Sequence, residues 1–178
     1  QKKSFEIDFL DVGQGDGIYL CTGGGTSMFI DGGSTDVKQV GKYRILPFLK
    51  AKGVSEISYW FVSHTDTDHV SGLKEVLVSG YRVEYLVFAK AVEKEAKTKE
   101  LEELARSHGT KVLYMQAGDT VRNKRAAMRC LYPKASDKAE DVNDLCLVLQ
   151  FEEGDIRALF GGDISTDVEA VSYTHLRA

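Results

Sequence analysis

The chain has 178 residues, of which 43% are hydrophobic and 28% charged, an ordinary composition for one globular domain. Its net charge of −4 does not argue for nucleic-acid binding and does not exclude it either, because a bound divalent metal would add positive charge that the count omits. The cysteines Cys21, Cys130 and Cys146 form no Cys-x-x-Cys pair, which argues against a disulfide framework or a cysteine zinc site. No run reaches the roughly 20 apolar residues of a membrane helix, so the chain is predicted to be soluble and to contain no transmembrane segment.

Hydrophobic spacing predicts a mixed chain in which strands and helices follow one another. Pro47 is expected at a kink or in the first turn of a shorter helix. The lysine- and glutamate-rich helix is interpreted as a solvated face with i,i+4 pairs Glu93–Lys97 and Glu95–Lys99. This order predicts layered sheets flanked by helices. The predicted strands are 5–9, 18–21, 28–30, 57–62, 83–88, 111–115, 127–131, 145–151 and 156–160, and the predicted helices are 40–52, 73–79 and 92–107.

The segment 63–69, Ser-His-Thr-Asp-Thr-Asp-His, places four possible metal ligands within six positions. It follows the apolar strand 57–62, and ligand-rich loops at strand ends are common sites of catalysis. Imidazole nitrogen and carboxylate oxygen both bind zinc, manganese and iron. The other interpretation is a polar surface loop with turn-forming residues. Carboxylates packed this densely repel one another without a cation, which favours the metal site.

This segment resembles the His-x-His-x-Asp-His signature of the metallo-β-lactamase superfamily, with Asp66 in place of the second histidine. With that departure, the chain resembles the hydrolase domain of the ComEC/Rec2 competence proteins from residue 4 to about residue 166. The resemblance also rests on FLDVGQGD at 9–16, FIDGG at 29–33, NDLCLVL at 143–149 and FGGDI at 160–164. It implies an α/β fold, the αββα sandwich of the metallo-β-lactamases, with only its N-terminal part present.

The resemblance also implies roles for individual residues. His64 and Asp66 would belong to a first metal position, and Asp68, also the catalytic residue, and His69 to a second. Asp163 would bridge the two metals, unless it is an ordinary turn residue. Asn143 stands where relatives often have a further histidine ligand, although an amide oxygen is a poorer ligand. Asp31 and Asp16 would orient ligands or brace the loops, and Asp16 could equally be a turn residue. Cys146, His108 and His175 are assigned no role.

By resemblance, the function is that of a metal-dependent hydrolase, a phosphodiesterase or nuclease that acts on DNA during uptake. Two divalent ions, manganese or zinc with magnesium also possible, would lie roughly 3.5–4 Å apart and activate water. Asp66 makes the first position harder and more negative, which favours manganese or magnesium over zinc. A hydrolase of a small thioester or phosphoester and a non-catalytic DNA-channel module remain open. Lys38, Lys42 and Arg44 could face a DNA backbone but are more simply a solvated surface.

The parent protein would lie in the bacterial cell membrane as a channel, with this domain on the extracytoplasmic side. The chain begins Gln1-Lys2-Lys3, which suggests a piece of a longer protein. Residues 171–178 fit nothing before them and are predicted to be a non-native tail, so the hydrolase domain would span 1–170 and be incomplete. The family's last histidine ligand would then lie beyond this chain, and the fragment by itself is expected to bind metal poorly and to be weak or inactive as an enzyme.

Overall fold

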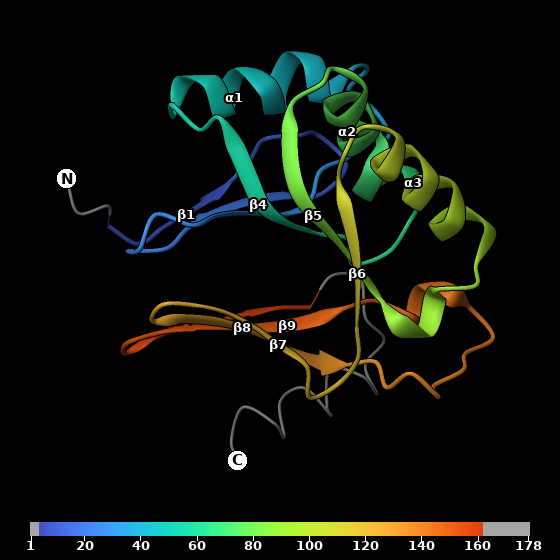
Figure 1. Cartoon of the computed structure of the whole chain (residues 1–178). Helices are drawn as coiled ribbons and strands as arrows, with labels where there is room; N and C mark the ends of the chain where they lie inside the picture. The colour runs from blue at the N-terminus through green and yellow to red at the C-terminus, as the bar shows by residue number, and fades with distance from the viewer. Residues whose placement is uncertain (1–3, 162–178) are drawn as a thin grey trace.

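The computed structural model describes residues 4–161, which form two β-sheets and a layer of helices (Figure 1). The predicted mixture of strands and helices is confirmed. Asp163 and the predicted tail lie outside the described residues. The strands are β1 (Glu6–Phe9), β2 (Gly17–Cys21), β3 (Ser27–Asp31), β4 (Glu56–Phe61), β5 (Arg82–Ala89), β6 (Lys111–Met115), β7 (Thr120–Asn123), β8 (Ala126–Tyr132), β9 (Val148–Glu153) and β10 (Ile156–Phe160). The helices are α1 (Leu46–Ala51), α2 (Thr67–Val78) and α3 (Ala96–Ser107), with short helical turns η1 (Gly41–Ile45), η2 (Lys90–Val92) and η3 (Val142–Leu145).

The first sheet has the strand order β1-β2-β3-β4-β5-β6. β1, β2 and β3 are antiparallel, whereas β3, β4, β5 and β6 run parallel to one another. Ile30 of β3 is paired with Phe61 of β4. The carboxyl ends of these two strands therefore lie side by side, and the residues that follow them meet at one edge of the sheet.

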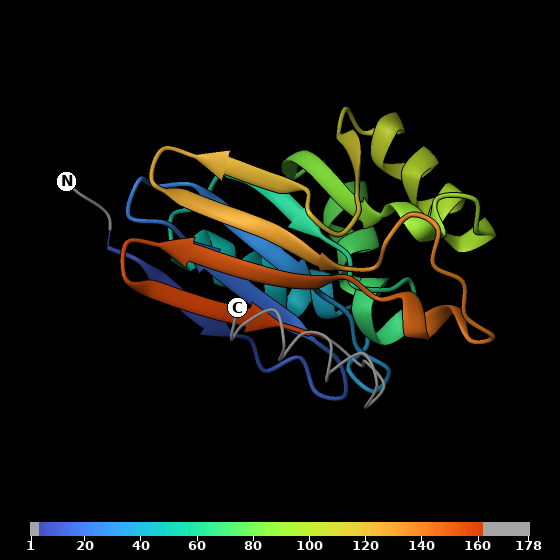
Figure 2. The same cartoon turned by 90° about the horizontal axis from the view of Figure 1, so that it is seen from below.

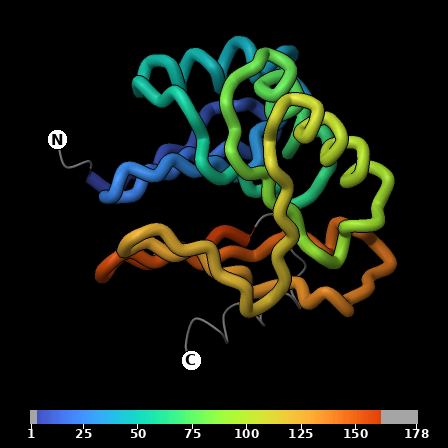
Figure 3. The backbone as a smooth tube through the Cα atoms, in the orientation of Figure 1, coloured from blue at the N-terminus to red at the C-terminus, as the bar shows by residue number. Residues whose placement is uncertain are grey.

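The second sheet is antiparallel, with the order β10-β9-β8-β7. Figure 3 shows the chain passing from the first sheet to the second directly after β6. Seen from below, the second sheet lies in front of the first sheet (Figure 2). Two stacked sheets of this kind bury the side chains of their facing surfaces.

Two apolar cores separate the layers. Trp60 and Leu73 belong to the core between the first sheet and the helices, which lie on one face of that sheet (Figure 1). Phe61 and Phe151 belong to the core between the two sheets. Trp60, Phe61, Leu73 and Phe151 are fully buried, and each such side chain stabilises the fold by ~2 kcal/mol. The neighbouring residues Trp60 and Phe61 thus point into different cores, so β4 is covered on both faces, as its continuous apolar run predicted.

The structure corrects several predicted boundaries. α2 begins at Thr67 rather than at 73, so the second half of the histidine segment is helical and not a loop. The predicted helix 40–52 is divided into η1 and α1, with Pro47 in the first turn of α1, where its missing N–H costs nothing. β7 was not predicted, and β9 begins at Val148 rather than at 145. Among the described residues, no helix is long and apolar enough to cross a membrane.

Candidate metal centre

The candidate site lies where β3 and β4 end, and three segments close around it. The loop before β2 contributes Asp16, the end of β3 contributes Asp31, and the first turn of α2 contributes Asp68 and His69. Backbone hydrogen bonds tie these segments together: the Asp16 N–H donates to the Asp68 carbonyl at 3.1 Å, and the Gly33 N–H donates to the Asp16 carbonyl at 3.1 Å. The site is therefore fixed by backbone contacts as well as by side chains.

Two glycines let these segments approach one another. A Cβ atom on Gly15 would lie 2.0 Å from the Gly33 carbonyl oxygen and 2.7 Å from the Asp68 carbonyl oxygen. A Cβ atom on Gly33 would lie 2.4 Å from the Thr67 carbonyl oxygen. These atoms belong to the backbone and cannot rotate away, so any side chain would push α2 off the loops. Close packing of backbones is the reason for glycine at positions 15 and 33 of the motifs 9–16 and 29–33.

Asp31 organises the interior of the site. It is 2% exposed and has a φ of 60°, an uncommon value for a residue with a side chain. Its Oδ1 atom accepts the Ser63 N–H at 2.7 Å, and its Oδ2 atom accepts the Ser63 hydroxyl at 2.6 Å and the Nδ1–H of His69 at 2.9 Å. The Trp60 indole N–H donates to the Asp31 carbonyl at 2.6 Å. Asp31 thus joins β3, the end of β4 and α2.

His69 is fully buried, and its two ring nitrogens have different surroundings. A carboxylate can only accept, so the contact with Asp31 assigns the hydrogen to Nδ1. The other nitrogen, Nε2, lies 3.4 Å from Oδ2 of Asp68 and 3.5 Å from Oδ2 of Asp16. In the neutral imidazole, Nε2 carries the lone pair that a metal would use. This is the usual arrangement of a histidine ligand whose second nitrogen is held by a carboxylate.

The negatively charged residues around His69 affect its pKa. Burial lowers this pKa, but the hydrogen bond to Asp31 and the charges of Asp31, Asp68 and Asp16 outweigh burial and raise it to about 9. The side chains of Asp68 and Asp16 are 34% and 47% exposed and open the cluster toward solvent. Such a group of carboxylates favours a cation between them.

Asp16 lies close to His69. The sequence predicts that it orients ligands, braces the loops or is a turn residue, and its carboxylate lies almost as close to Nε2 of His69 as that of Asp68. One donor atom from each of Asp16, Asp31 and His69 lies within 4.8 Å of the others, a group that could hold a metal ion. Because the Asp31 oxygens already accept three hydrogen bonds, we assign Asp31 to orientation and Asp16 to the face on which an ion would bind.

His64 lies directly beside this cluster. It is 6% exposed, and its ring centroid is 3.6 Å from that of His69. Its Nδ1 atom accepts the Asp66 N–H at 3.3 Å, which leaves Nε2 as the atom that could bind a metal. The predicted ligands His64, Asp68 and His69 are therefore brought together by the end of β4 and the first turn of α2.

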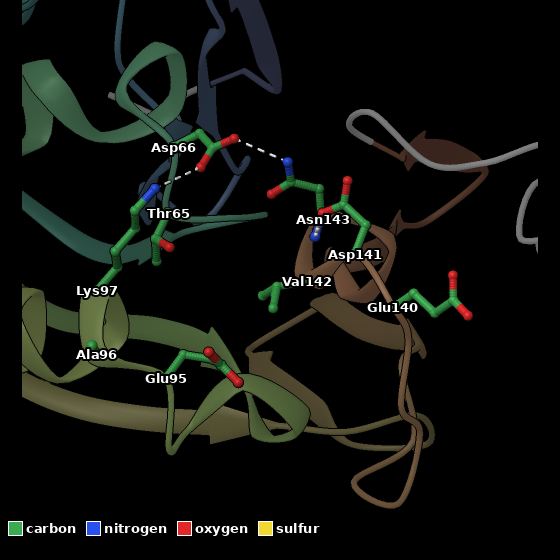
Figure 4. A pocket seen from close by; sticks show the side chains of 9 residues that line it. All are labelled: Thr65, Asp66, Glu95, Ala96, Lys97, Glu140, Asp141, Val142 and Asn143. Atoms are coloured by element: carbon green, nitrogen blue, oxygen red, sulfur yellow. Dashed lines mark hydrogen bonds and ion pairs between the residues drawn. The ribbon is translucent and has the colours of Figure 1, made fainter.

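The Asp66 carboxylate forms its hydrogen bonds with residues outside this cluster. Its Oδ1 atom accepts a hydrogen bond from Nζ of Lys97 at 3.1 Å, and its Oδ2 atom accepts one from Nδ2 of Asn143 at 3.0 Å (Figure 4). The Lys97 hydrogen bond is the main cause that holds the pKa of the Asp66 carboxyl below its usual range. Asn143 thus contacts a predicted ligand through its amide nitrogen, whereas a metal would need its amide oxygen.

Sequence patterns do not identify every residue of the site. Ser63 was noted only as the start of the histidine segment, although its hydroxyl and N–H both bind Asp31. Lys97 was assigned to a solvated face with Glu93 as its partner. Lys97 is 68% exposed, as a solvated face requires, but the predicted pair was wrong, because α3 begins at Ala96 and Glu93 lies before it, where it pairs with Lys90. The other predicted pair, Glu95–Lys99, was also wrong, since Lys99 pairs with Glu102.

The remaining predicted residues lie away from the cluster or outside the described chain. Asp163 and His175 are outside the described residues. Cys146 is fully buried, and its thiol lies 3.7 Å from the Gly161 carbonyl oxygen. His108 is exposed at the end of α3, where its Nδ1 atom lies 2.9 Å from the Leu104 carbonyl oxygen.

Solved structures with this arrangement of sheets define the class of protein. The chain superposes on a metallo-β-lactamase of Cronobacter sakazakii with a HARLDQ motif (TM-score 0.62, 13% identity, 90% of this chain and 57% of that chain). It also superposes on zinc-bound PqqB from Methylobacterium extorquens (TM-score 0.58, 13% identity, 87% of this chain and 56% of that chain). The chain therefore has the metallo-β-lactamase fold.

Within this class, sequence similarity is specific. The chain is 29% identical over 177 residues to ComE operon protein 3 of Bacillus subtilis (strain 168), covering 92% of this chain and 23% of that protein. It is 29% identical over 85 residues to Recombination protein 2 of Haemophilus influenzae (strain ATCC 51907 / DSM 11121 / KW20 / Rd), covering 48% of this chain and 11% of that protein. No family model matches the chain. The resemblance to the hydrolase domain of the ComEC/Rec2 competence proteins is confirmed, and the chain spans less than a quarter of these relatives' length.

Proposed function

We propose that this chain is the metal-dependent hydrolase domain of a ComEC-like competence protein and cleaves phosphodiesters of DNA during uptake. One observation carries the proposal: Nε2 of His69 lies between Asp68 and Asp16, beside His64, while Nδ1 is held by Asp31. Imidazole nitrogens and carboxylate oxygens are a donor set that fits manganese, zinc and magnesium. The excess of carboxylates around one buried imidazole favours manganese or magnesium over zinc.

Each residue has a defined task in this proposal. His64, Asp66, Asp68 and His69, with Asp16, would hold two divalent ions, and Asp163 would complete the set. Asp31 and Ser63 would keep His69 in the tautomer that offers Nε2. When bound, the ions would supply Lewis acidity and lower the pKa of water, so that a nucleophile forms near neutral pH without a strong side-chain base.

A basic cavity supports DNA as the substrate. Arg129, Lys134 and Lys138 line a cavity of about 640 Å³ beside Tyr132 and Asp137. None of the three cations forms an ion pair within residues 4–161, whereas most exposed lysines on α2 and α3 are paired. From residue 122 to 138 the chain has six basic residues and one acidic residue, although its net charge is −4. Clustered unpaired cations are the usual contact for a phosphate backbone.

The proposal is tested with the product of the parent gene, because the chain spans less than a quarter of the length of its curated relatives. Manganese added to the metal-free protein should restore cleavage of a labelled DNA strand, and Asp68→Ala should abolish it. Asp155→Asn, an exposed change on the β9–β10 turn, should leave cleavage unchanged. DNA binding with no cleavage under any divalent metal would support the non-catalytic module instead. Cleavage of a small thioester or phosphoester but not of DNA would support the other hydrolase. Activity restored by zinc alone would contradict the preference for harder metals.

A further inference from the structure

Each oxygen of the Asp66 carboxylate accepts a hydrogen bond from a different element of the fold. Lys97 in the first turn of α3 binds Oδ1 at 3.1 Å, and Asn143 of η3 binds Oδ2 at 3.0 Å. These residues line one cavity of about 650 Å³ (Figure 4). Three segments far apart in the sequence therefore converge on one carboxylate.

This arrangement differs from that of the other acidic residues of the site. Asp68 and Asp16 turn their oxygens toward Nε2 of His69. Oδ2 of Asp66 lies 3.9 Å from Nδ1 of His64, and both Asp66 oxygens accept hydrogen bonds from other partners. A metal that bound Asp66 would have to compete with an ammonium group for the carboxylate.

Several carboxylates line this cavity, and Lys97 pairs with that of Asp66. The side chain of Lys97 is 68% exposed, so water could solvate it without any partner. Glu95, Glu140 and Asp141 line the same cavity, yet the ammonium group lies against Asp66. A cation at this point cancels one negative charge of the position that includes His64 and Asp66. Like charges repel, so the ammonium group opposes the entry of a metal ion.

We propose that Lys97 is a positioning residue that holds Asp66 and makes the metal position of His64 and Asp66 the weaker of the two. This inference rests on the proposed function, since it concerns the affinity of the same site for divalent ions. It assigns to Lys97 and Asn143 a control over metal occupancy: the position of Asp68 and His69 fills first, and the position of Asp66 fills only when a metal displaces the ammonium group.

The test is titration of manganese into the metal-free product of the parent gene by calorimetry, with the bound fraction followed by electron paramagnetic resonance. Lys97→Met should tighten the weaker binding event by about tenfold, the effect expected for one charge near a partly exposed site, and leave the tighter event unchanged. Lys97→Arg keeps the charge and should bind like the wild type. Lys94→Met removes a charge from an exposed residue nearby and should have no effect. Circular dichroism checks that each variant is folded.

The outcomes separate this inference from the proposed function. If the wild type binds manganese but Lys97→Met binds it equally or more weakly, the assignment of Lys97 is wrong and the proposed function is untouched. If Lys97→Arg tightens binding as much as Lys97→Met, charge is not the cause and the assignment is also wrong. If the wild type takes up no divalent metal, the proposed function fails and this inference fails with it.

Discussion

Oδ2 of Asp31 lies 2.9 Å from Nδ1 of His69, although 38 positions separate the two residues in the chain. Both side chains are buried, and Asp31 also binds the Ser63 hydroxyl and N–H. The contact fixes the tautomer of His69 and so determines which nitrogen faces Asp68 and Asp16. Asp31 therefore determines which nitrogen of His69 is available to a metal, and it need not contact the metal itself.

Asp31→Asn tests this role. The amide cannot accept all the hydrogen bonds that the carboxylate accepts, so His69 loses its fixed orientation. We expect manganese affinity to fall by about 10- to 100-fold, the usual effect of losing such a partner. Calorimetry measures it, with Asp155→Asn as the control for removal of a carboxylate. An affinity equal to that of the wild type would show that His69 is oriented by other groups.

Gly33→Ala tests the close approach of the loops to α2. The new Cβ atom would meet the Thr67 carbonyl oxygen at 2.4 Å and the Val70 nitrogen at 2.6 Å. We expect the free energy of unfolding in urea to fall by ~3 kcal/mol, because overpacking against a backbone cannot relax by rotation of a side chain. Gly24→Ala is the control, since its nearest contact is the flexible Lys124 side chain at 3.2 Å. Equal stability of both variants would contradict the tight packing of the site.

Acid stability depends in part on Glu102, which joins α3 to β6. The Tyr114 hydroxyl donates to its carboxylate, and this bond is the main cause that holds the pKa of Glu102 below its ordinary value of 4.5. A lowered pKa in the folded state stabilises the protein above that ordinary value, and this stability is lost as the pH falls. Glu102→Gln should therefore flatten the stability profile between about pH 5 and pH 3.

Urea unfolding at a series of pH values measures this profile. Glu103→Gln, at the exposed neighbouring position, should leave it unchanged. If Glu102→Gln and the wild type lose stability in parallel below pH 5, the ion-paired Glu102 does not contribute to acid stability.

The basic cavity predicts a salt-dependent interaction with DNA. Replacing Arg129, Lys134 and Lys138 with glutamine should weaken oligonucleotide binding in the presence of EDTA. The slope of log K against log salt should become shallower by about 0.7 for each phosphate of a single strand that the variant no longer neutralises. The matched control neutralises Lys38, Lys42 and Arg44, which are exposed and lie outside this cavity. A larger decrease in the control would place the DNA-binding surface at η1.

The sequence predicted the parts of the fold whose signal is local. The continuous apolar run of β4 and the position of the histidine segment after it were both recognised, because burial on two faces requires such a run. The start of α2 was missed because its first turn is polar. Asp66 precedes that turn in an extended conformation, and apolar spacing becomes visible only from Val70. β7 was missed because its four residues Thr-Val-Arg-Asn are mostly polar.

The site was predicted only in part, because a sequence pattern identifies residues that are close together in the chain. His64, Asp68 and His69 are neighbours in sequence and in space, so a motif could identify them. The contact of Lys97 with Asp66 spans 31 positions and that of Asn143 spans 77. Both depend on how α3 and η3 pack, which no local pattern encodes. Asp16 was recognised through the motif 9–16, but its closeness to Nε2 of His69 follows only from the fold.

The central claim is that the carboxylates around Nε2 of His69 hold a divalent ion. The most direct test is calorimetric titration of manganese into the metal-free product of the parent gene and into its Asp68→Asn variant. We predict saturable binding by the wild type and an affinity at least about tenfold lower for Asp68→Asn, the cost of losing one charged ligand. Equal affinity of the two proteins, or no binding by the wild type, would contradict the claim.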